Sequence, residues 1–157
     1  SNMKLMMNGA LTIGTRDGAT IEMPEEAGEE NFFLFGLTAE QVAGSRDWYS
    51  PQWHYDHEPE TRAALDLIFS NHFSRNEPGV FEPLRETLLT HGDYYMHLAD
   101  LASYLEADQR LCQLYADSAG WAKKAILNIA NSGKFSSDRT IAEYAKEIWN
   151  VKPCAVE

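Results

Sequence analysis

Two short apolar runs near the amino terminus most constrain the fold of this chain. Residues 10–13 and 32–35 are apolar without alternation, and glycines flank both runs. Such runs are typical of strands buried on both faces, as in parallel sheets. Residues 20–23, which end before Pro24, are a candidate third strand. We therefore expect an α/β chain with a short parallel sheet near its amino terminus.

The predicted sheet is small, and both of its faces need to be covered by other elements. Residues 25–31 are acidic and predict a short helix or turn between strands. Three strands alone make a poor sheet, and strands that are apolar on both faces need a layer on each side. Part of this cover is expected to lie outside the chain, which would leave apolar surface and favour a discrete dimer.

From Thr38 onward the pattern is helical. Thr38 with Gln41 predicts a capping box, Pro59 opens a further helix, and Ser136 or Ser137 caps the last one, which fades after Trp149. With 157 residues we expect a single domain with a strand-containing segment (1–36), a helical part (37–150) and a tail (151–157). The predicted inward faces are Ala64, Leu67 and Ile68; Phe81, Leu84 and Leu88; Leu98, Leu101, Leu105, Cys112 and Tyr115; Trp121, Ala125, Ile126 and Ile129; and Ile141, Tyr144 and Ile148.

Composition excludes several classes of partner. The net charge is −11, from 24 acidic and 13 basic residues, which disfavours nucleic acids and anionic membranes. No apolar run approaches the roughly 20 residues of a membrane span. Cys112 and Cys154 are too few for a disulfide framework, so a reducing cytoplasm fits best, and Cys112 is expected to be a small core residue.

Lys4 is the leading candidate for chemistry. It stands beside Leu5, Met6 and Met7, and apolar surroundings disfavour the ammonium form and make an amine nucleophilic. The alternative is a surface lysine whose stem lies over an apolar patch.

The residues around Lys4 resemble the cofactor-attachment region of the α-glucan phosphorylases. Met3, Lys4, Met7 and Asn8 fit the second half of that signature, and its first half, Glu-Ala-Ser-Gly, would precede Ser1. Arg16 and Thr20 depart from the family pattern, which usually has an apolar residue and an asparagine there. The resemblance continues in the family's order through residues 8–15, 17–19, 22–23, 25–36, 121–128, 132–141, 144 and 148–149.

This resemblance implies a function and an architecture. The family cleaves terminal α-1,4-glucosyl units with inorganic phosphate and releases glucose 1-phosphate. Lys4 would anchor pyridoxal phosphate covalently, while the cofactor's own phosphate assists proton transfer. The chain would be a carboxy-terminal fragment that begins at the cofactor lysine. It would form the helix-rich end of a Rossmann-like domain in a two-domain glycosyltransferase of GT-B type.

The same resemblance places the catalytic groups upstream of this chain. We therefore expect no catalytic residue here, an inactive isolated chain, and no pyridoxal phosphate on Lys4 in isolation, because a lysine near a free terminus is solvated. The parent enzyme is expected to be a cytoplasmic homodimer. One alternative is a non-catalytic, truncated phosphorylase-derived module that acts through association. A generic glycosyltransferase domain fits less well, because it needs no such lysine.

The remaining glycine and polar clusters are expected to have structural roles, not functional ones. Gly9, Gly14 and Gly18 match neither dinucleotide-binding spacing nor a P-loop, and are expected to be turn positions. No metal site is expected. The two candidate clusters, read as polar surface groups, are His54, Asp56 and His57, and His91, Asp93 and His97.

Overall fold

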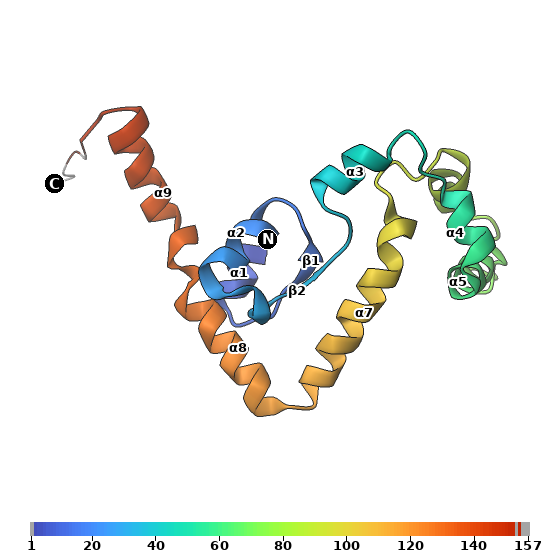
Figure 1. Cartoon of the computed structure of the whole chain (residues 1–157), viewed down its shortest axis with the longest axis horizontal. Coiled ribbons are helices and arrows are strands. Elements are labelled where there is room, and N and C mark those ends of the chain that lie inside the picture. The colour runs from blue at the N-terminus through green and yellow to red at the C-terminus, as the bar shows by residue number, and fades with distance from the viewer. Residues whose placement is uncertain (1, 153, 155–157) are drawn as a thin grey trace. The chain divides into compact units, whose positions relative to one another are not determined.

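The computed structural model describes residues 2–152 and residue 154 (Figure 1). The chain divides into two compact units, each described here by itself. The first unit contains Ser1–Ile13, Gly18–Phe33 and Leu111–Glu157. The second contains Gly14–Asp17 and Leu34–Arg110.

In the described part of the chain, the sheet has two parallel strands, β1 (Ile13–Thr15) and β2 (Phe33–Phe35). Its register is visible where the Phe33 amide donates to the Thr12 carbonyl over 3.0 Å. The predicted parallel pairing is confirmed, although β1 begins at the last residue of its apolar run. The expected burial on both faces is wrong for β1, whose three residues are all half-buried.

Residues 20–23 are not a strand, contrary to expectation. They lie in helix α2 (Ala19–Ala27), which follows Gly18. The buried residues of α2 are Thr20, Met23, Pro24 and Ala27, a helical spacing that places them on one face. A four-residue apolar run is too short to distinguish strand from helix, and here contact with the rest of the unit decided the outcome.

The first unit is a small cluster of helices around two methionines. Met6 and Met23 have no exposed surface, and Phe32 and Ala27 are also buried. Figure 1 shows helix α1 (Asn2–Met7) and α2 near α8 (Ser118–Ala130), and both contact it. Lys134 forms an ion pair with Glu26. The unit's remaining elements are η1 (Glu29–Asn31), η3 (Ser132–Phe135), α9 (Ser137–Glu143) and η4 (Tyr144–Ile148).

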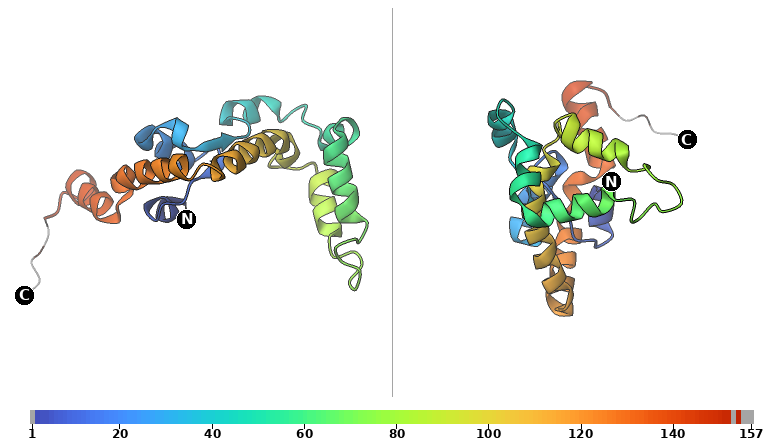
Figure 2. Two further views of the ribbon diagram at one scale, coloured as in Figure 1. Left: turned by 90° about the horizontal axis from the view of Figure 1, so that it is seen from below. Right: turned by 90° about the vertical axis from the view of Figure 1, so that its right-hand side faces the viewer.

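The second unit is built from helices around Leu65, Met96, Leu98 and Ala107. Figure 2 shows its helical hairpins, in which α4 contacts both α5 and η2. Its elements are α3 (Ala39–Ser45), α4 (Pro51–His57), α5 (Pro59–Phe69), α6 (Glu82–Arg85), η2 (Glu86–Thr90) and most of α7 (His97–Tyr115).

The predicted helix starts are confirmed. The Gln41 amide donates to the Thr38 hydroxyl over 3.2 Å, and the Thr38 amide donates to the Gln41 side chain over 2.9 Å, which completes the capping box. Pro59 begins α5, and Ser136 is the N-cap position of α9. These signals act within one turn of chain, so they hold whatever packs above them.

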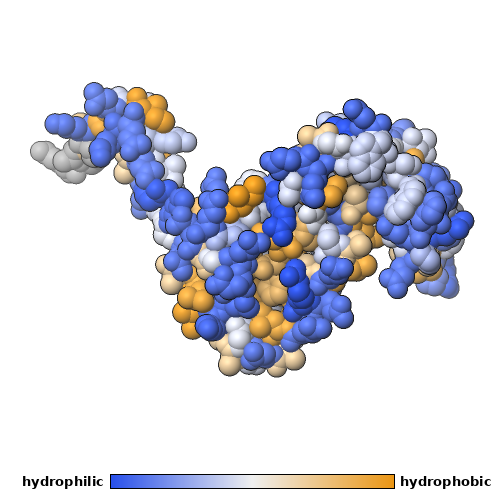
Figure 3. Space-filling model, viewed as in Figure 1, coloured by the Kyte–Doolittle hydropathy of each residue, from blue (hydrophilic) through white to orange (hydrophobic). Residues whose placement is uncertain are grey.

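The predicted inward faces are wrong at many positions. On α5 the buried residues are Thr61 and Leu65, whereas Ala64 and Leu67 are exposed. No residue of α6, η2, α9 or η4 is buried. Figure 3 shows apolar groups at the surface around α8 and α9. Predicted inward residues that are exposed include Leu84, Leu105, Cys112, Tyr115, Ile126, Ile129, Ile141, Tyr144 and Ile148.

Asp93 was expected at the surface and is instead almost completely buried, with 1% of its surface exposed. Its Oδ2 accepts hydrogen bonds from the Tyr49 hydroxyl, over 2.8 Å, and from the Leu98 amide, over 2.9 Å. Burial raises the pKa of Tyr49 well above its ordinary value, and the hydrogen bond to Asp93 adds to the shift. The Asp93 carboxylate thus ties the segment after α3 to the first turn of α7.

This arrangement predicts a loss of stability at alkaline pH. Because the pKa of Tyr49 is raised in the folded chain, the neutral phenol stabilises the fold below the ordinary tyrosine pKa of about 10 and this stabilisation is lost as pH rises above it. We expect the free energy of unfolding, from urea titrations, to fall as pH rises from about 10 to 12. Tyr49→Phe should flatten this fall, whereas Tyr115→Phe, at a side chain that is 76% exposed, should not. Equal slopes in the wild type and Tyr49→Phe would contradict the prediction.

Candidate functional site

Lys4 lies on α1 with its side chain exposed. Residues two apart on a helix point about 200° away from each other, so the buried Met6 anchors one face and Lys4 projects from the opposite one. The expected apolar surroundings of the amine do not form within the described residues, since Leu5 and Met7 are 57% and 53% exposed. α1 therefore presents Lys4 to solvent.

The end of α1 is held by Gly9. Its φ of 82° is left-handed, its amide donates to the Met6 carbonyl over 3.1 Å, and the Ala10 amide donates to the Leu5 carbonyl over 3.0 Å. This pair of bonds is a Schellman motif, which glycine favours because it has no Cβ. A Cβ at Gly9 would also lie 3.4 Å from Ile129 on α8. The glycine expected as a turn position thus ends the helix that carries Lys4.

Lys4 fits the anchoring role that the resemblance implies. Covalent capture of an aldehyde needs a primary amine that the aldehyde can reach, and Lys4 supplies one. The Asn8 side chain donates to the Lys4 carbonyl over 2.7 Å, which holds the backbone of the signature residues in one conformation. The structure therefore brings together Lys4 and Asn8 of the predicted signature, with the lysine amine accessible.

The first of the two histidine clusters, at His54, Asp56 and His57, makes local contacts. His54 Nδ1 lies 2.8 Å from Glu58 Oε1, and His57 Nδ1 lies 2.9 Å from the Trp53 carbonyl, both within or beside α4. Gln52 donates to Asp56 over 3.0 Å. Among residues 2–152 and 154, no three histidine, cysteine or acidic side chains are grouped so that they could hold a metal ion.

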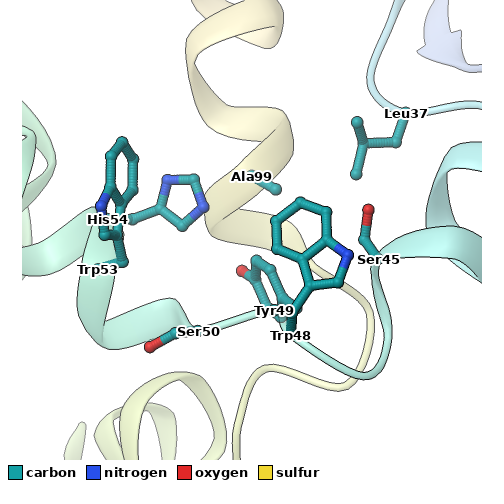
Figure 4. Close-up of a pocket in the computed structure, with 8 residues that line it drawn as sticks. All are labelled: Leu37, Ser45, Trp48, Tyr49, Ser50, Trp53, His54 and Ala99. Carbon is teal, nitrogen blue, oxygen red and sulfur yellow. The ribbon is translucent and has the colours of Figure 1, made fainter.

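Sequence reasoning missed an aromatic pocket in the second unit (Figure 4). The pocket has a volume of about 490 Å³. Its sequence signal is the density of aromatic residues in 47–57, which has no helical or strand period. The lining residues are Leu37, Ser45, Trp48, Tyr49, Ser50, Trp53, His54 and Ala99.

A second pocket of the same unit contains Arg16, one of the two residues that depart from the family pattern. The pocket has a volume of about 520 Å³ and includes Arg46 and Asp100. Arg46 lies over the Tyr94 ring, 4.6 Å from its centroid, and Asp100 accepts from the Leu37 amide over 2.8 Å. The charged groups of this pocket therefore make contacts that position the chain.

None of the helices in the described part of the chain has the length and apolar content to cross a membrane.

Comparisons with known proteins agree with the resemblance around Lys4. The family described as Carbohydrate phosphorylase matches residues 1–151. The chain is 52% identical over 153 residues to the brain form of glycogen phosphorylase from Homo sapiens, covering 97% of the chain. It is 49% identical over 153 residues to the muscle form from Bos taurus and 48% identical over 157 residues to glycogen phosphorylase from Synechocystis sp., covering 97% and 99% of the chain.

The match covers only part of each relative. The chain spans 18% of the length of these three glycogen phosphorylases. One family model nonetheless matches nearly the whole chain. The matched residues include the Lys4 signature, the two strands and every described helix. The chain therefore belongs to the carbohydrate phosphorylase family.

Proposed function

We propose that this chain is the cofactor-lysine segment of an α-glucan phosphorylase, in which Lys4 is the attachment point of pyridoxal phosphate. The observation that supports this most is the family match over residues 1–151, which contains Met3, Lys4, Met7 and Asn8 in the attachment pattern. In the longer enzyme the reaction is phosphorolysis of terminal α-1,4-glucosyl units to glucose 1-phosphate. The substrates are an α-1,4-glucan and inorganic phosphate.

Lys4 positions the cofactor and does not itself transfer a proton to substrate. When bound, pyridoxal phosphate supplies a phosphate group that assists proton transfer to and from the substrate phosphate. α1 contributes a fixed point for it, because Met6 is buried and Gly9 ends the helix in one geometry. A fixed anchor is useful in catalysis because misplacing a reacting group by about 1 Å can cost on the order of a hundredfold in rate.

The wider architecture is part of the same proposal. The two parallel strands and the following helices form the end of a Rossmann-like domain in a GT-B enzyme. Residues 1–36 carry the cofactor lysine, residues 37–150 form the helical part, and residues 151–157 are a tail. The parent enzyme works in the cytoplasm as a homodimer. Residues 153 and 155–157 of the tail lie outside the described part of the chain.

A second candidate, an association module without catalysis, is favoured by the exposed apolar side chains. Ile126 is 63% exposed, Ile148 66% and Trp149 56%. Exposed apolar surface of this kind is typical of contact sites. In the isolated chain these side chains would drive association, while the net charge of −11 opposes unlimited aggregation.

Replacing Lys4 in the longer enzyme tests the main proposal. Lys4→Ala should remove bound pyridoxal phosphate and phosphorolysis together, because the attachment amine is lost. Lys123→Ala, at an exposed lysine of α8, is the matched control and should retain both. Cofactor content is measured by absorbance after denaturation, and activity by release of glucose 1-phosphate. A Lys4→Ala enzyme that keeps a full complement of cofactor would contradict the assignment.

The isolated chain should not retain pyridoxal phosphate. Its Lys4 side chain is exposed to solvent on α1, which offers a bound cofactor little enclosure. After incubation with pyridoxal phosphate and gel filtration, we expect well below one equivalent bound, equal in the wild type, Lys4→Ala and Lys123→Ala. Stoichiometric retention that Lys4→Ala abolishes would show that this chain holds the cofactor without further sequence.

The isolated chain should form a discrete dimer. Its exposed apolar side chains on α8, α9 and η4 lower their contact with water by pairing, whereas charge repulsion limits growth. Light scattering coupled to size-exclusion chromatography should give twice the 17.7 kDa chain mass. Ile148→Lys should shift the chain toward monomer. A wild-type monomer at all concentrations, with uniform hydrogen-exchange protection, would argue for a self-sufficient domain.

A further inference from the structure

The aromatic pocket of the second unit has the features of a site for a small neutral ligand. Its volume of about 490 Å³ falls within the range of ligand pockets, roughly 300–1,000 Å³. Half of its eight lining residues are aromatic or imidazole rings, and none is an acidic or strongly basic side chain. In a chain with a net charge of −11, an uncharged pocket favours an uncharged ligand.

The walls of the pocket are held in place before any ligand binds. The Tyr49 hydroxyl donates to the buried Asp93, and the indole of Trp48 donates to the Gly44 carbonyl over 2.9 Å. Trp53 stacks on His57, with ring centroids 4.9 Å apart and planes 15° apart. Because these rings are already ordered, a ligand would bind without the cost of immobilising them.

Two tryptophan side chains of the pocket are exposed to solvent, although their contacts hold them in place. Trp48 is 73% exposed and Trp53 is 53% exposed. In Figure 4, Trp53 and His54 lie at one end of the group of side chains, with Trp48 and Tyr49 toward its centre. Fixed, solvent-facing indoles offer flat apolar surfaces together with polar edges, a combination that suits amphipathic ligands.

The polar groups of the pocket suit hydroxyl groups. His54 Nδ1 lies 2.8 Å from the Glu58 carboxylate, which leaves Nε2 as the ring nitrogen that can bond to a ligand hydroxyl. Ser50 adds an exposed hydroxyl, which donates or accepts. A ligand with several hydroxyls and an apolar ring face meets both requirements, whereas a purely apolar ligand would leave these groups without partners.

We infer that this pocket binds a glucose unit of an α-1,4-glucan. The C–H face of a pyranose ring packs on the exposed indoles of Trp48 and Trp53, and its hydroxyls bond to Ser50 and His54. The choice of α-1,4-glucan among neutral sugars rests on the proposed function. Lys4 belongs to the other unit and is not one of the residues that line this pocket.

Calorimetric titration of the 157-residue chain with maltoheptaose tests this inference, with cellohexaose as the β-linked control. We expect maltoheptaose to bind measurably and cellohexaose to bind at least tenfold more weakly. Trp48→Ala and Trp53→Ala should each weaken maltoheptaose binding by about tenfold, which corresponds to about 1.4 kcal/mol and is of the size expected for a lost aromatic contact. Trp149→Ala removes a tryptophan that is 56% exposed in the other unit and should leave the affinity unchanged.

Indole resonances of the unsubstituted chain provide a measurement that does not depend on variants folding. Maltoheptaose should shift the Trp48 and Trp53 signals and leave those of Trp121 and Trp149 in place. Absence of binding, equal binding of cellohexaose, or shifts spread over all four indoles would overturn the inference. Lys4→Ala should leave maltoheptaose binding unchanged, so failure at this pocket and failure of the cofactor assignment are distinguishable.

Discussion

The second unit depends on one buried carboxylate. Burial of a polar group is costly unless hydrogen bonds replace those that it made to water. Asp93 Oδ2 receives two, from the Tyr49 hydroxyl and the Leu98 amide, whereas its Oδ1 is buried without a hydrogen-bond partner among the described residues. Asp93 also has a φ of 46°, in the left-handed region that aspartate tolerates better than most residues. These bonds join Tyr49 of the aromatic pocket to the first turn of α7.

The first unit uses apolar burial for a comparable purpose. Met6 has no exposed surface, and Gly9 allows α1 to end directly beside Ile129 of α8. One short helix therefore buries a methionine and holds Lys4 in solvent on its opposite face. The apolar character of residues 5–7 thus positions the helix, and it does not by itself change the surroundings of the lysine amine.

The exposed helix faces explain why the periodicity of apolar residues predicted the helices correctly but predicted their burial wrongly. Ile141, Tyr144 and Ile148 have the spacing of one helical face, and α9 and η4 form where that spacing predicts a helix. All three side chains are nevertheless 45–66% exposed. A helical spacing states which residues share a face, but burial also requires a surface to pack against. These faces remain available to a partner.

The sequence by itself determined the local structure and the family. Thr38 and Pro59 start helices because capping and a restricted φ act within one turn, and the pattern around Lys4 led to the family that the comparisons show. Tertiary structure alone decided burial. Asp93 became a buried anchor, residues 20–23 became helical, and the aromatic residues after α3 formed a pocket. These outcomes depend on contacts between residues far apart in the chain, which neither propensity nor periodicity encodes.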